Sequence, residues 1–570
     1  MEYQTEKRMC QNCKGDFTID PEDFVFYDKI KVPPPTFCPE CRNIRRLSWR
    51  NNRSLHSRSC GVCKKNLISF YKDDGAPVYC ESCYSGDNWD MYKFSADVDF
   101  SKDFFTQLKN ILNVQPRVFS IRYGTNLDSD YSNSIVNSKN LYLSFSSIES
   151  ENIFYSENVD RSKDCFDCLS CIDIQQCSWN INSEKNYNCH YMFESKNCMD
   201  SSFLFDCSNC SNCFMSSGLR NESYVFRNVK LSKSDYEKAI QDLERGSFKT
   251  LVILKDEFKG LISSATHRFA NVIASVDVSG DIITRSKNVK KSFDIMEAED
   301  ISYSYRIVKS KDLMDCGWVL AGELEYETMT GSGGSFNQVS CFMCVSSRDI
   351  QYSISCKNCT DCIGCVGLTN ARYCILNKQY SKDAYFDAVG KIKKHMIYIP
   401  YVDKQGRVYK YGEFFPTGFS LFGYNESLAN DMYPISKDTA LDMGYNWYER
   451  DIRDYKTNQD KDTLPDCISE INDSILDDVI LCSKVEGFSN QCTYAFRIKK
   501  EELEFCKKNN LPIPRLCPNC RHEERLRYRN PLSLYNRECS NNCGTTFQTT
   551  YAPDRPERVY CEKCYQQEVL

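Results

Sequence analysis

The chain has 570 residues, too many for one hydrophobic core, and at roughly 100–200 residues per domain it predicts several domains. Apolar residues form 41% of the chain and aromatic residues 13%, which excludes wholesale disorder. A formal net charge of −6 excludes a protein that coats nucleic acid along its whole length.

The first residues, MEYQTEKRMC, lack the apolar core of a secretory signal, and no run of about 18 uncharged apolar residues occurs in the chain. We therefore expect an intracellular, cytoplasmic protein. Thiols stay reduced in that compartment, so the 35 cysteines should be metal ligands, small core residues or redox groups rather than disulfides.

The first predicted unit, residues 1–95, contains four C-x-x-C pairs. Two such pairs supply the four thiolates of a closed tetrahedral Zn²⁺ site, so we expect two structural zinc ions here rather than a small core of buried thiols. We favour consecutive pairs sharing a metal, although the spacing also allows the first pair to join the third. The eight expected ligands are Cys10, Cys13, Cys38, Cys41, Cys60, Cys63, Cys80 and Cys83.

An arginine stripe follows the second cysteine pair. Arg42, Arg46 and Arg50 are spaced by four residues, which places them on one face of a helix beside Trp49, and Arg58 follows. Guanidinium groups next to an aromatic ring could bind phosphates and stack on a base, so one hypothesis is binding of RNA or single strands. The alternative, which we weigh equally, is that the arginines bridge the zinc sites or dock on an acidic surface of the protein.

A repeat occupies residues 128–228, after a predicted helical linker at 96–127. A polar residue followed by an apolar residue or cysteine recurs every 12 positions. Twelve extended residues span roughly 40 Å, enough for one tight coil or half of a wider one, so we expect a β-solenoid with 12- or 24-residue coils. The pairs are Asn140-Leu141, Asn152-Ile153, Asp164-Cys165, Gln176-Cys177 and Asn188-Cys189, then Asn197-Cys198 and Asn209-Cys210.

A second array is predicted over residues 276–377. Cysteine alternates with Leu, Ile and Val at the repeated position, as a small buried hydrophobe does. The alternative is a metal cluster at Cys356, Cys359, Cys362 and Cys365. Each array is followed by a segment in which Tyr and Ala have helical spacing. These segments predict a helical bridge at 229–275 and an α/β connector at 378–470. The second series is Asn288-Val289, Asp300-Ile301, Asp312-Leu313, Asp349-Ile350, Asp361-Cys362 and Tyr373-Cys374.

The last unit, residues 471–570, repeats the first. CPNCRHEERLRYRN matches CPECRNIRRLSWRN, which predicts an internal duplication with two more zinc ions, about four in all. Ser489 stands where Cys10 stands in the first copy, so Cys482 is expected to replace it as a ligand. The ligands predicted here are Cys482, Cys492, Cys517, Cys520, Cys539, Cys543, Cys561 and Cys564. The second arginine face consists of Arg521, Arg525 and Arg529, with Tyr528 and Arg537.

The run from Cys10 through FTI, FVFYD and CPECR resembles the probable zinc-ribbon (treble-clef) domain. The whole layout, including EFFPTGFSLFGYNESLA and YAPDRPERVYCEKCY, is similar to uncharacterised zinc-ribbon proteins of uncultured bacterial lineages or giant viruses. The resemblance implies zinc binding and brings no established activity.

Enzyme signatures are scarce, because the chain has five histidines and no GxSxG motif, P-loop or paired histidines. We expect a mostly β, non-enzymatic zinc scaffold, with two solenoid arrays between the terminal modules. Its arginine faces would engage nucleic acid or an acidic protein partner. The alternatives are a structural or interaction protein without nucleic-acid binding and, less favoured, a solenoid enzyme with a carboxylate-lined groove for carbohydrate.

Overall fold

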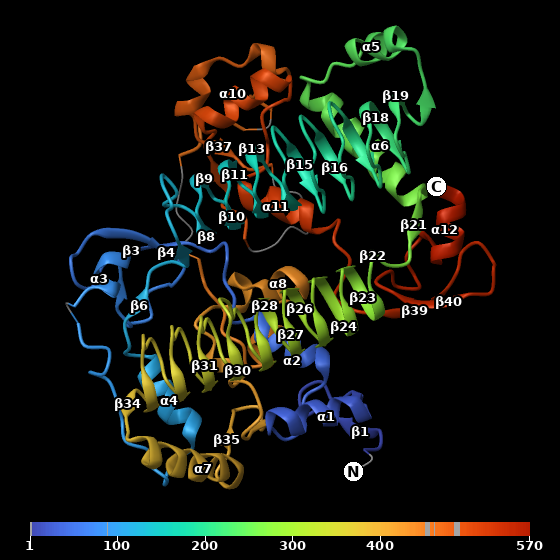
Figure 1. Cartoon of the computed structure of the whole chain (residues 1–570). Coiled ribbons are helices and arrows are strands. Elements are labelled where there is room, and N and C mark those ends of the chain that lie inside the picture. Colours follow the sequence, from blue (N-terminus) through green and yellow to red (C-terminus); the bar gives the residue numbers. More distant parts are fainter. Residues whose placement is uncertain (1–2, 88, 451–455, 461, 484–490, 570) are drawn as a thin grey trace.

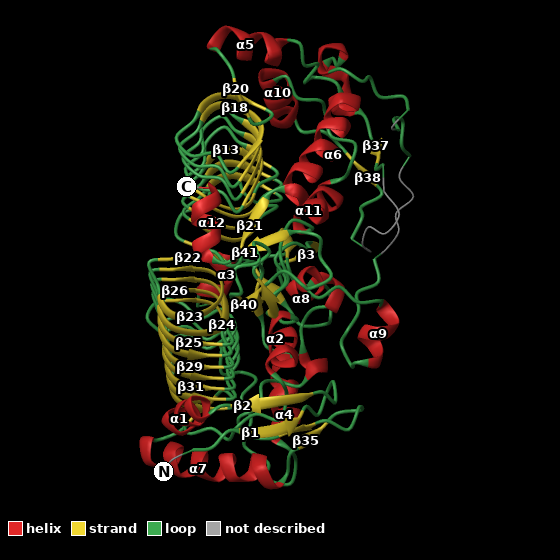
Figure 2. Ribbon diagram, turned by 90° about the vertical axis from the view of Figure 1, so that its right-hand side faces the viewer, coloured by secondary structure: helices red, strands yellow, loops and turns green. Residues whose placement is uncertain are grey.

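The computed structural model describes residues 3–87, 89–450, 456–460, 462–483 and 491–569. Two large parallel sheets dominate it, one of 14 and one of 13 strands. Figure 2 shows them as two stacks of strands, one above the other, with α11, α8 and α2 in succession along one side. The protein is therefore mostly β, as the sequence predicts, and these three helices lie beside the two stacks.

The first array begins at β7 and ends at β20, and from β8 to β19 its strands pair in parallel at a spacing of 12 residues. Glu151 pairs with both Lys139 and Lys163, and Ile153 pairs with Cys165. One turn of the array is thus a 12-residue coil, and the 24-residue alternative is excluded. The strands are β7 (Arg122–Tyr123), β8 (Asn133–Val136), β9 (Lys139–Tyr142), β10 (Phe145–Ile148), β11 (Glu151–Phe154), β12 (Glu157–Asp160), β13 (Lys163–Phe166), β14 (Leu169–Ile172), β15 (Ser178–Ile181), β16 (His190–Phe193), β17 (Ser202–Phe205), β18 (Ser211–Ser217), β19 (Ser223–Phe226) and β20 (Val229–Lys230).

The second array has the same 12-residue register over most of its length. One coil is a residue longer, since Glu323 pairs with Phe336, and Gly333 and Gly334 in this coil both have positive φ. Its strands are β22 (Val272–Ile273), β23 (Val276–Thr284), β24 (Lys287–Met296), β25 (Glu299–Ser302), β26 (Tyr305–Val308), β27 (Lys311–Met314), β28 (Gly317–Leu320), β29 (Glu323–Tyr326), β30 (Phe336–Val339), β31 (Arg348–Gln351), β32 (Thr360–Ile363), β33 (Arg372–Ile375) and β34 (Lys378–Gln379).

Each coil turns at every third residue, where the backbone is left-handed. In the coil that starts at Asn140, the four left-handed residues have φ between 47° and 54°. The residue that follows each of them is buried, so a coil has four three-residue sides. Asparagine and aspartate tolerate this conformation better than most residues, which explains why they recur at the corners. The side-chain amide of Asn140 donates to Asn152, and that of Asn152 donates to Asp164, which ties successive coils together.

Serine and cysteine side chains make the same hydrogen bond inside the arrays, to the backbone carbonyl two residues earlier. The hydroxyl of Ser150 donates to the carbonyl of Ile148 at 2.9 Å, and the thiol of Cys165 donates to the carbonyl of Lys163 at 3.1 Å. These buried hydroxyl and thiol groups thereby have hydrogen-bond partners. The cysteines predicted to lie inside are all buried: Cys165, Cys177, Cys189, Cys198, Cys210, Cys362 and Cys374.

The alternative of a metal cluster in the second array is not supported. Cys356, Cys359, Cys362 and Cys365 each donate a thiol to the carbonyl two residues earlier, as the other interior cysteines do. Among the described residues, no group of ligand atoms lying mutually within 4.8 Å includes these four. They belong to the interior of the array.

Helices follow both arrays where the sequence predicts them. Ser232 caps α5 (Lys233–Gln241) and Ser381 caps α7 (Lys382–Tyr398), in each case by accepting a hydrogen bond from a backbone N–H in the first turn. The bridge also contains α6 (Phe248–Ser264) and β21 (Thr266–Arg268), and the linker contains α4 (Phe104–Leu112). The connector contains β35 (Tyr401–Val402), β36 (Val408–Tyr409), η1 (Thr417–Phe419), η2 (Tyr424–Glu426), α8 (Leu428–Met432), α9 (Lys437–Asp442) and η3 (Ile468–Glu470). None of the described helices is long and apolar enough to cross a membrane.

The two terminal modules are built from β-hairpins and short helices. The N-terminal module contains β1 (Glu6–Met9), β2 (Asp16–Ile19), α1 (Pro21–Ile30), α2 (Pro39–Leu47), β3 (His56–Ser59), β4 (Asn66–Ser69), β5 (Val78–Tyr79) and α3 (Glu81–Ser85), and β5 pairs with β6 (Arg117–Val118). The C-terminal module contains η4 (Asp473–Asp477), β37 (Ile480–Leu481), β38 (Ala495–Phe496), α10 (Lys500–Asn509), α11 (Pro518–Leu526), β39 (Tyr535–Glu538), β40 (Thr546–Thr549), β41 (Arg558–Tyr560) and α12 (Glu562–Val569).

Candidate metal centres

Sixteen cysteines form four tetrads. The sulfur atoms of each tetrad lie within 4.8 Å of one another, close enough to bind one metal ion. Four thiolates are the donor set of structural zinc sites. Consecutive pairs share a tetrad, as we favoured from the sequence, and the first pair does not join the third. The tetrads are Cys10, Cys13, Cys38 and Cys41; Cys60, Cys63, Cys80 and Cys83; Cys482, Cys492, Cys517 and Cys520; and Cys539, Cys543, Cys561 and Cys564.

The first tetrad shows how local structure positions the ligands. Cys10 and Cys13 lie in the turn between β1 and β2, where Lys14 has a left-handed backbone and donates its N–H to the carbonyl of Cys10. Cys38 is the N-cap of α2 and Cys41 lies in its first turn. A hairpin turn and a helix start therefore face each other, each supplying two thiolates.

One hydrogen bond recurs in all four tetrads and identifies equivalent ligands. In the first tetrad the backbone N–H of Cys38 donates to the sulfur of Cys10 at 3.3 Å. In the third the N–H of Cys517 donates to the sulfur of Cys482 at 3.2 Å. Cys482 thus occupies the place of Cys10, as predicted, whereas Ser489 lies outside the described residues. The corresponding bonds of the other tetrads run from Cys80 to Cys60 and from Cys561 to Cys539.

The N-terminal arginine face is buried against the second array. Arg42 and Arg46 are each only 1% exposed. Arg42 lies 2.8 Å from a carboxylate oxygen of Asp315, while Arg46 lies 3.2 Å from Asp315 and 2.7 Å from Glu327. Arg45, which the sequence analysis did not single out, is also buried and contacts Glu327 at 3.0 Å.

The C-terminal arginine face makes the equivalent contact with the first array. Arg521 and Arg525 lie 2.5 Å from the two carboxylate oxygens of Asp167, and Arg529 donates to the hydroxyl of Ser170. Asp167 and Asp315 both occupy left-handed corners. Each module therefore docks on one array through a pair of arginines that share an aspartate at a corner of a coil.

The pKa values of the buried arginines and of Asp315 are shifted by burial and by each other's charges. Burial lowers the pKa of Arg42, but the charge of Asp315 and nearby tyrosines outweighs burial, and the pKa lies well above its usual value. Burial raises the pKa of Asp315, opposed by Arg42 and Arg46. Burial and the neighbouring Arg306 lower the pKa of Arg50 to about 9.

The remaining members of the predicted arginine faces are buried or half-buried. Trp49 packs on Phe342, Phe414 and Phe415, and Tyr528 packs on Trp179 and Phe193. Neither ring is free to stack on a base.

Arg50 reaches Thr330 of the second array and Ser134 of the first. Arg58 and Arg537, at matching positions, each donate to two backbone carbonyls of their own module. The exposed arginine faces that the nucleic-acid hypothesis requires are not formed, and the alternative of docking on an acidic surface of the arrays is correct.

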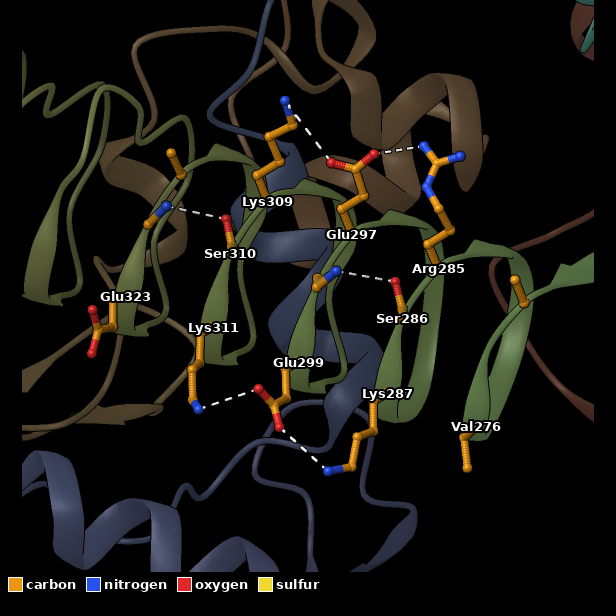
Figure 3. A pocket seen from close by; sticks show the side chains of 14 residues that line it. Val276, Arg285, Ser286, Lys287, Glu297, Glu299, Lys309, Ser310, Lys311 and Glu323 are labelled. Atoms are coloured by element: carbon orange, nitrogen blue, oxygen red, sulfur yellow. Dashed lines mark hydrogen bonds and ion pairs between the residues drawn. The ribbon is translucent and has the colours of Figure 1, made fainter.

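An open surface of the second array carries charged residues in a shallow hollow of about 770 Å³. Figure 3 shows these charges paired along the array. Glu297 lies between Arg285 and Lys309, and the next side has Glu299 between Lys287 and Lys311. Glu297 and Glu299 are therefore each held between two cations, which is the arrangement of an ion-pair ladder rather than of paired catalytic carboxylates.

A fifth group of potential ligands was missed by the sequence analysis: Glu157, Asp431 and His522. These residues are far apart in the sequence and no motif links them.

No protein-family model matches the chain, and the search of curated proteins found no match.

Proposed function

We propose that this protein is a non-enzymatic scaffold in which four structural zinc ions clamp two β-solenoid arrays. The tetrads have the donor set of closed zinc sites, and their hairpin-and-helix geometry is that expected of zinc-ribbon or treble-clef modules. None of the 35 cysteines forms a disulfide, which fits a reducing compartment such as the cytoplasm.

The observation that carries the proposal is the crosswise docking of the modules. The N-terminal module places α2 on the second array through Arg42 and Asp315, and the C-terminal module places α11 on the first array through Arg521 and Asp167 (Figure 1). In each case a metal ligand immediately precedes the docking arginine: Cys41 precedes Arg42 and Cys520 precedes Arg521. Zinc would therefore hold the first turn of each docking helix in place.

The proposal does not assign nucleic-acid binding to these helices. A phosphate group could reach Arg42 or Arg46 only after a buried ion pair had been broken, which would cost several kcal/mol. The surface available to a macromolecular partner is instead the open side of the arrays, where the corner amides and the alternating charges are exposed. We expect a protein partner to bind there.

Hydrogen exchange tests the clamp role with a built-in control. Cys517→Ser should accelerate exchange in β13 and β14 of the first array, while leaving β27 to β29 protected. Cys41→Ser should do the reverse, because its module docks on the second array. Changes confined to the mutated module in both variants would contradict the clamp role.

A nucleic-acid titration tests the other part of the proposal. Single-stranded RNA, followed by fluorescence anisotropy at low salt, should show no binding that depends on Arg42, Arg46 and Arg50. Binding that falls steeply with salt and is lost from the folded triple alanine variant would restore the nucleic-acid hypothesis.

A further inference from the structure

A second kind of metal-ligand group lies where the C-terminal module, the first array and the connector meet. His522 comes from α11, Glu157 from β12 and Asp431 from α8. The Nε2 atom of His522 lies 3.4 Å from a carboxylate oxygen of Glu157 and 3.9 Å from one of Asp431. Two ligands that each lie about 2.1 Å from a common metal ion are roughly 3–3.5 Å apart, so the three side chains are close to coordinating distance.

Three polar atoms of this group make no hydrogen bond to the residues that the structure describes. His522 is 4% exposed, and neither of its ring nitrogens has a hydrogen bond among the described residues. Glu157 is 2% exposed, and one of its carboxylate oxygens accepts from Asn52 at 2.9 Å. The other lies 3.8 Å from a terminal nitrogen of Arg53 and has no hydrogen bond within the described part of the chain. Buried polar atoms without partners are costly, and those of His522 and Glu157 point to a bound group that satisfies both.

A cavity of about 610 Å³ adjoins the group, and Asp431 and His522 line it. Arg53, the ion-pair partner of Glu157, lines the same cavity, and its two terminal nitrogens make no hydrogen bond to any described residue. Three protein ligands leave positions on a metal ion unfilled, so those positions would open into this cavity. The four cysteine tetrads have no such vacancy.

Two carboxylates and one imidazole converge at this point, and Arg525, three residues after His522 in α11, is already paired with Asp167.

We propose that His522, Glu157 and Asp431 bind one divalent transition-metal ion of the Mn²⁺, Fe²⁺ or Zn²⁺ class, with its open positions facing the cavity beside Arg53. One imidazole and two carboxylates form a mixed nitrogen–oxygen donor set, which suits these ions and differs from the thiolate sets of the tetrads. This site goes beyond the scaffold role, because a metal ion with open positions can bind a further ligand.

The duplicated module provides the matched variant. Asn43 occupies in α2 the position that His522 occupies in α11, and it donates to the hydroxyl of Tyr433. His522→Asn therefore places a residue that the sister helix already carries, and the variant is expected to fold. Asp431→Asn is a second variant that keeps the side-chain shape. Asn43→Ala is the control in the sister helix.

The experiment titrates the full chain, with about four zinc ions bound in its tetrads and none in excess, with Mn²⁺, which prefers oxygen and nitrogen ligands and does not displace zinc from thiolates. Electron paramagnetic resonance should detect one bound Mn²⁺ per chain in the wild-type protein and in Asn43→Ala. Affinity should fall more than about tenfold in His522→Asn and in Asp431→Asn. Bound Mn²⁺ should enhance water-proton relaxation, because water can occupy the open positions.

Two results would overturn the proposal: no bound Mn²⁺ in the wild-type protein, or equal binding in the wild-type and His522→Asn proteins. Zinc analysis of the same samples separates this site from the scaffold. A zinc content of about four in every variant shows that the tetrads are intact, so a loss of Mn²⁺ binding then belongs to the new site alone.

Discussion

Arg42 and Arg521 stand at equivalent positions of the duplicated modules, and each makes a buried ion pair with an aspartate at a corner of a different array. The aspartates, Asp315 and Asp167, each precede a buried cysteine of a coil, Cys316 and Cys168. The same contact was thus established twice, between segments that are 273 and 354 residues apart.

Removing one of these arginines should destabilise the protein strongly. Arg42→Ala leaves Asp315 buried without its main partner, and we expect the free energy of unfolding to fall by about 3–5 kcal/mol. The control is Arg161→Ala, because Arg161 forms an exposed pair with Asp173, whose loss should cost about 1 kcal/mol or less. Chemical denaturation measures both; equal losses would show that the buried pair has no special role.

Cys482 should be required for one metal ion. Cys482→Ser removes a thiolate from the third tetrad, so the metal content of the purified protein should fall from about four ions to about three. Cys506→Ser is the matched control, because Cys506 is buried in the same core but belongs to no tetrad. Metal analysis by mass spectrometry decides the matter; retention of four ions in Cys482→Ser would remove Cys482 from the ligand set.

Glu325 should make stability depend on pH. It is fully buried inside the second array between Leu313 and Gln338 of the neighbouring coils, and burial raises its pKa from an ordinary 4.5 to about 7, against a hydrogen bond from Ser335. Because the folded state holds the proton more tightly, the stabilisation is complete below pH 4.5. It is lost as pH rises to 7, by about 3 kcal/mol in total.

Glu325→Gln tests this dependence, since the next coil already carries Gln338 at the same position. The variant should gain stability relative to the wild-type protein as pH rises from 5.5 to 8, and denaturation at both pH values measures the gain. Glu323→Gln, an exposed substitution on the same strand, controls for the exchange itself. A difference between wild type and Glu325→Gln that does not vary with pH would contradict the assignment.

Serine should replace an interior cysteine at little cost. The backbone N–H of Cys168 donates to Ser156 of the preceding coil, and the thiol donates to Phe166 as the neighbouring serines do. Cys168→Ser should therefore change stability by about 1 kcal/mol or less, whereas Cys168→Leu, which overfills the coil, should cost about 1–3 kcal/mol. Thermal unfolding compares them; a larger loss for serine than for leucine would show that the site requires an apolar group.

The metal sites were predictable because most of their ligands come in pairs that are close together in the sequence. A C-x-x-C pair places two ligands in one turn, and the duplication supplied the second copy of the pattern. The 12-residue repeat was also predictable, but its three-residue subdivision was not recognised. Serine alternates with leucine and cysteine at the buried positions, because its hydroxyl can donate to the carbonyl two residues earlier. A search of the sequence for apolar residues alone therefore overlooks the serine positions.

The destination of the arginine faces could not be predicted in the same way. The spacing of Arg42, Arg46 and Arg50 marks one helix face, and the structure has that face, but helical spacing does not say what covers it. Asp315 and Glu327 are one coil apart and far away in the chain, so nothing near the arginines identifies them. His522, Glu157 and Asp431 belong to three separate segments and share no spacing, so only the folded structure brings them together.

The crosswise docking also determines when the protein can assemble during synthesis. The N-terminal module can bind its metal ions early, but the partner of Arg42 is translated 273 residues later. The first array must likewise wait for Arg521, 354 residues beyond Asp167. Neither half of the chain contains a complete module-and-array pair, so the docked arrangement can close only after segments of both halves have been synthesised.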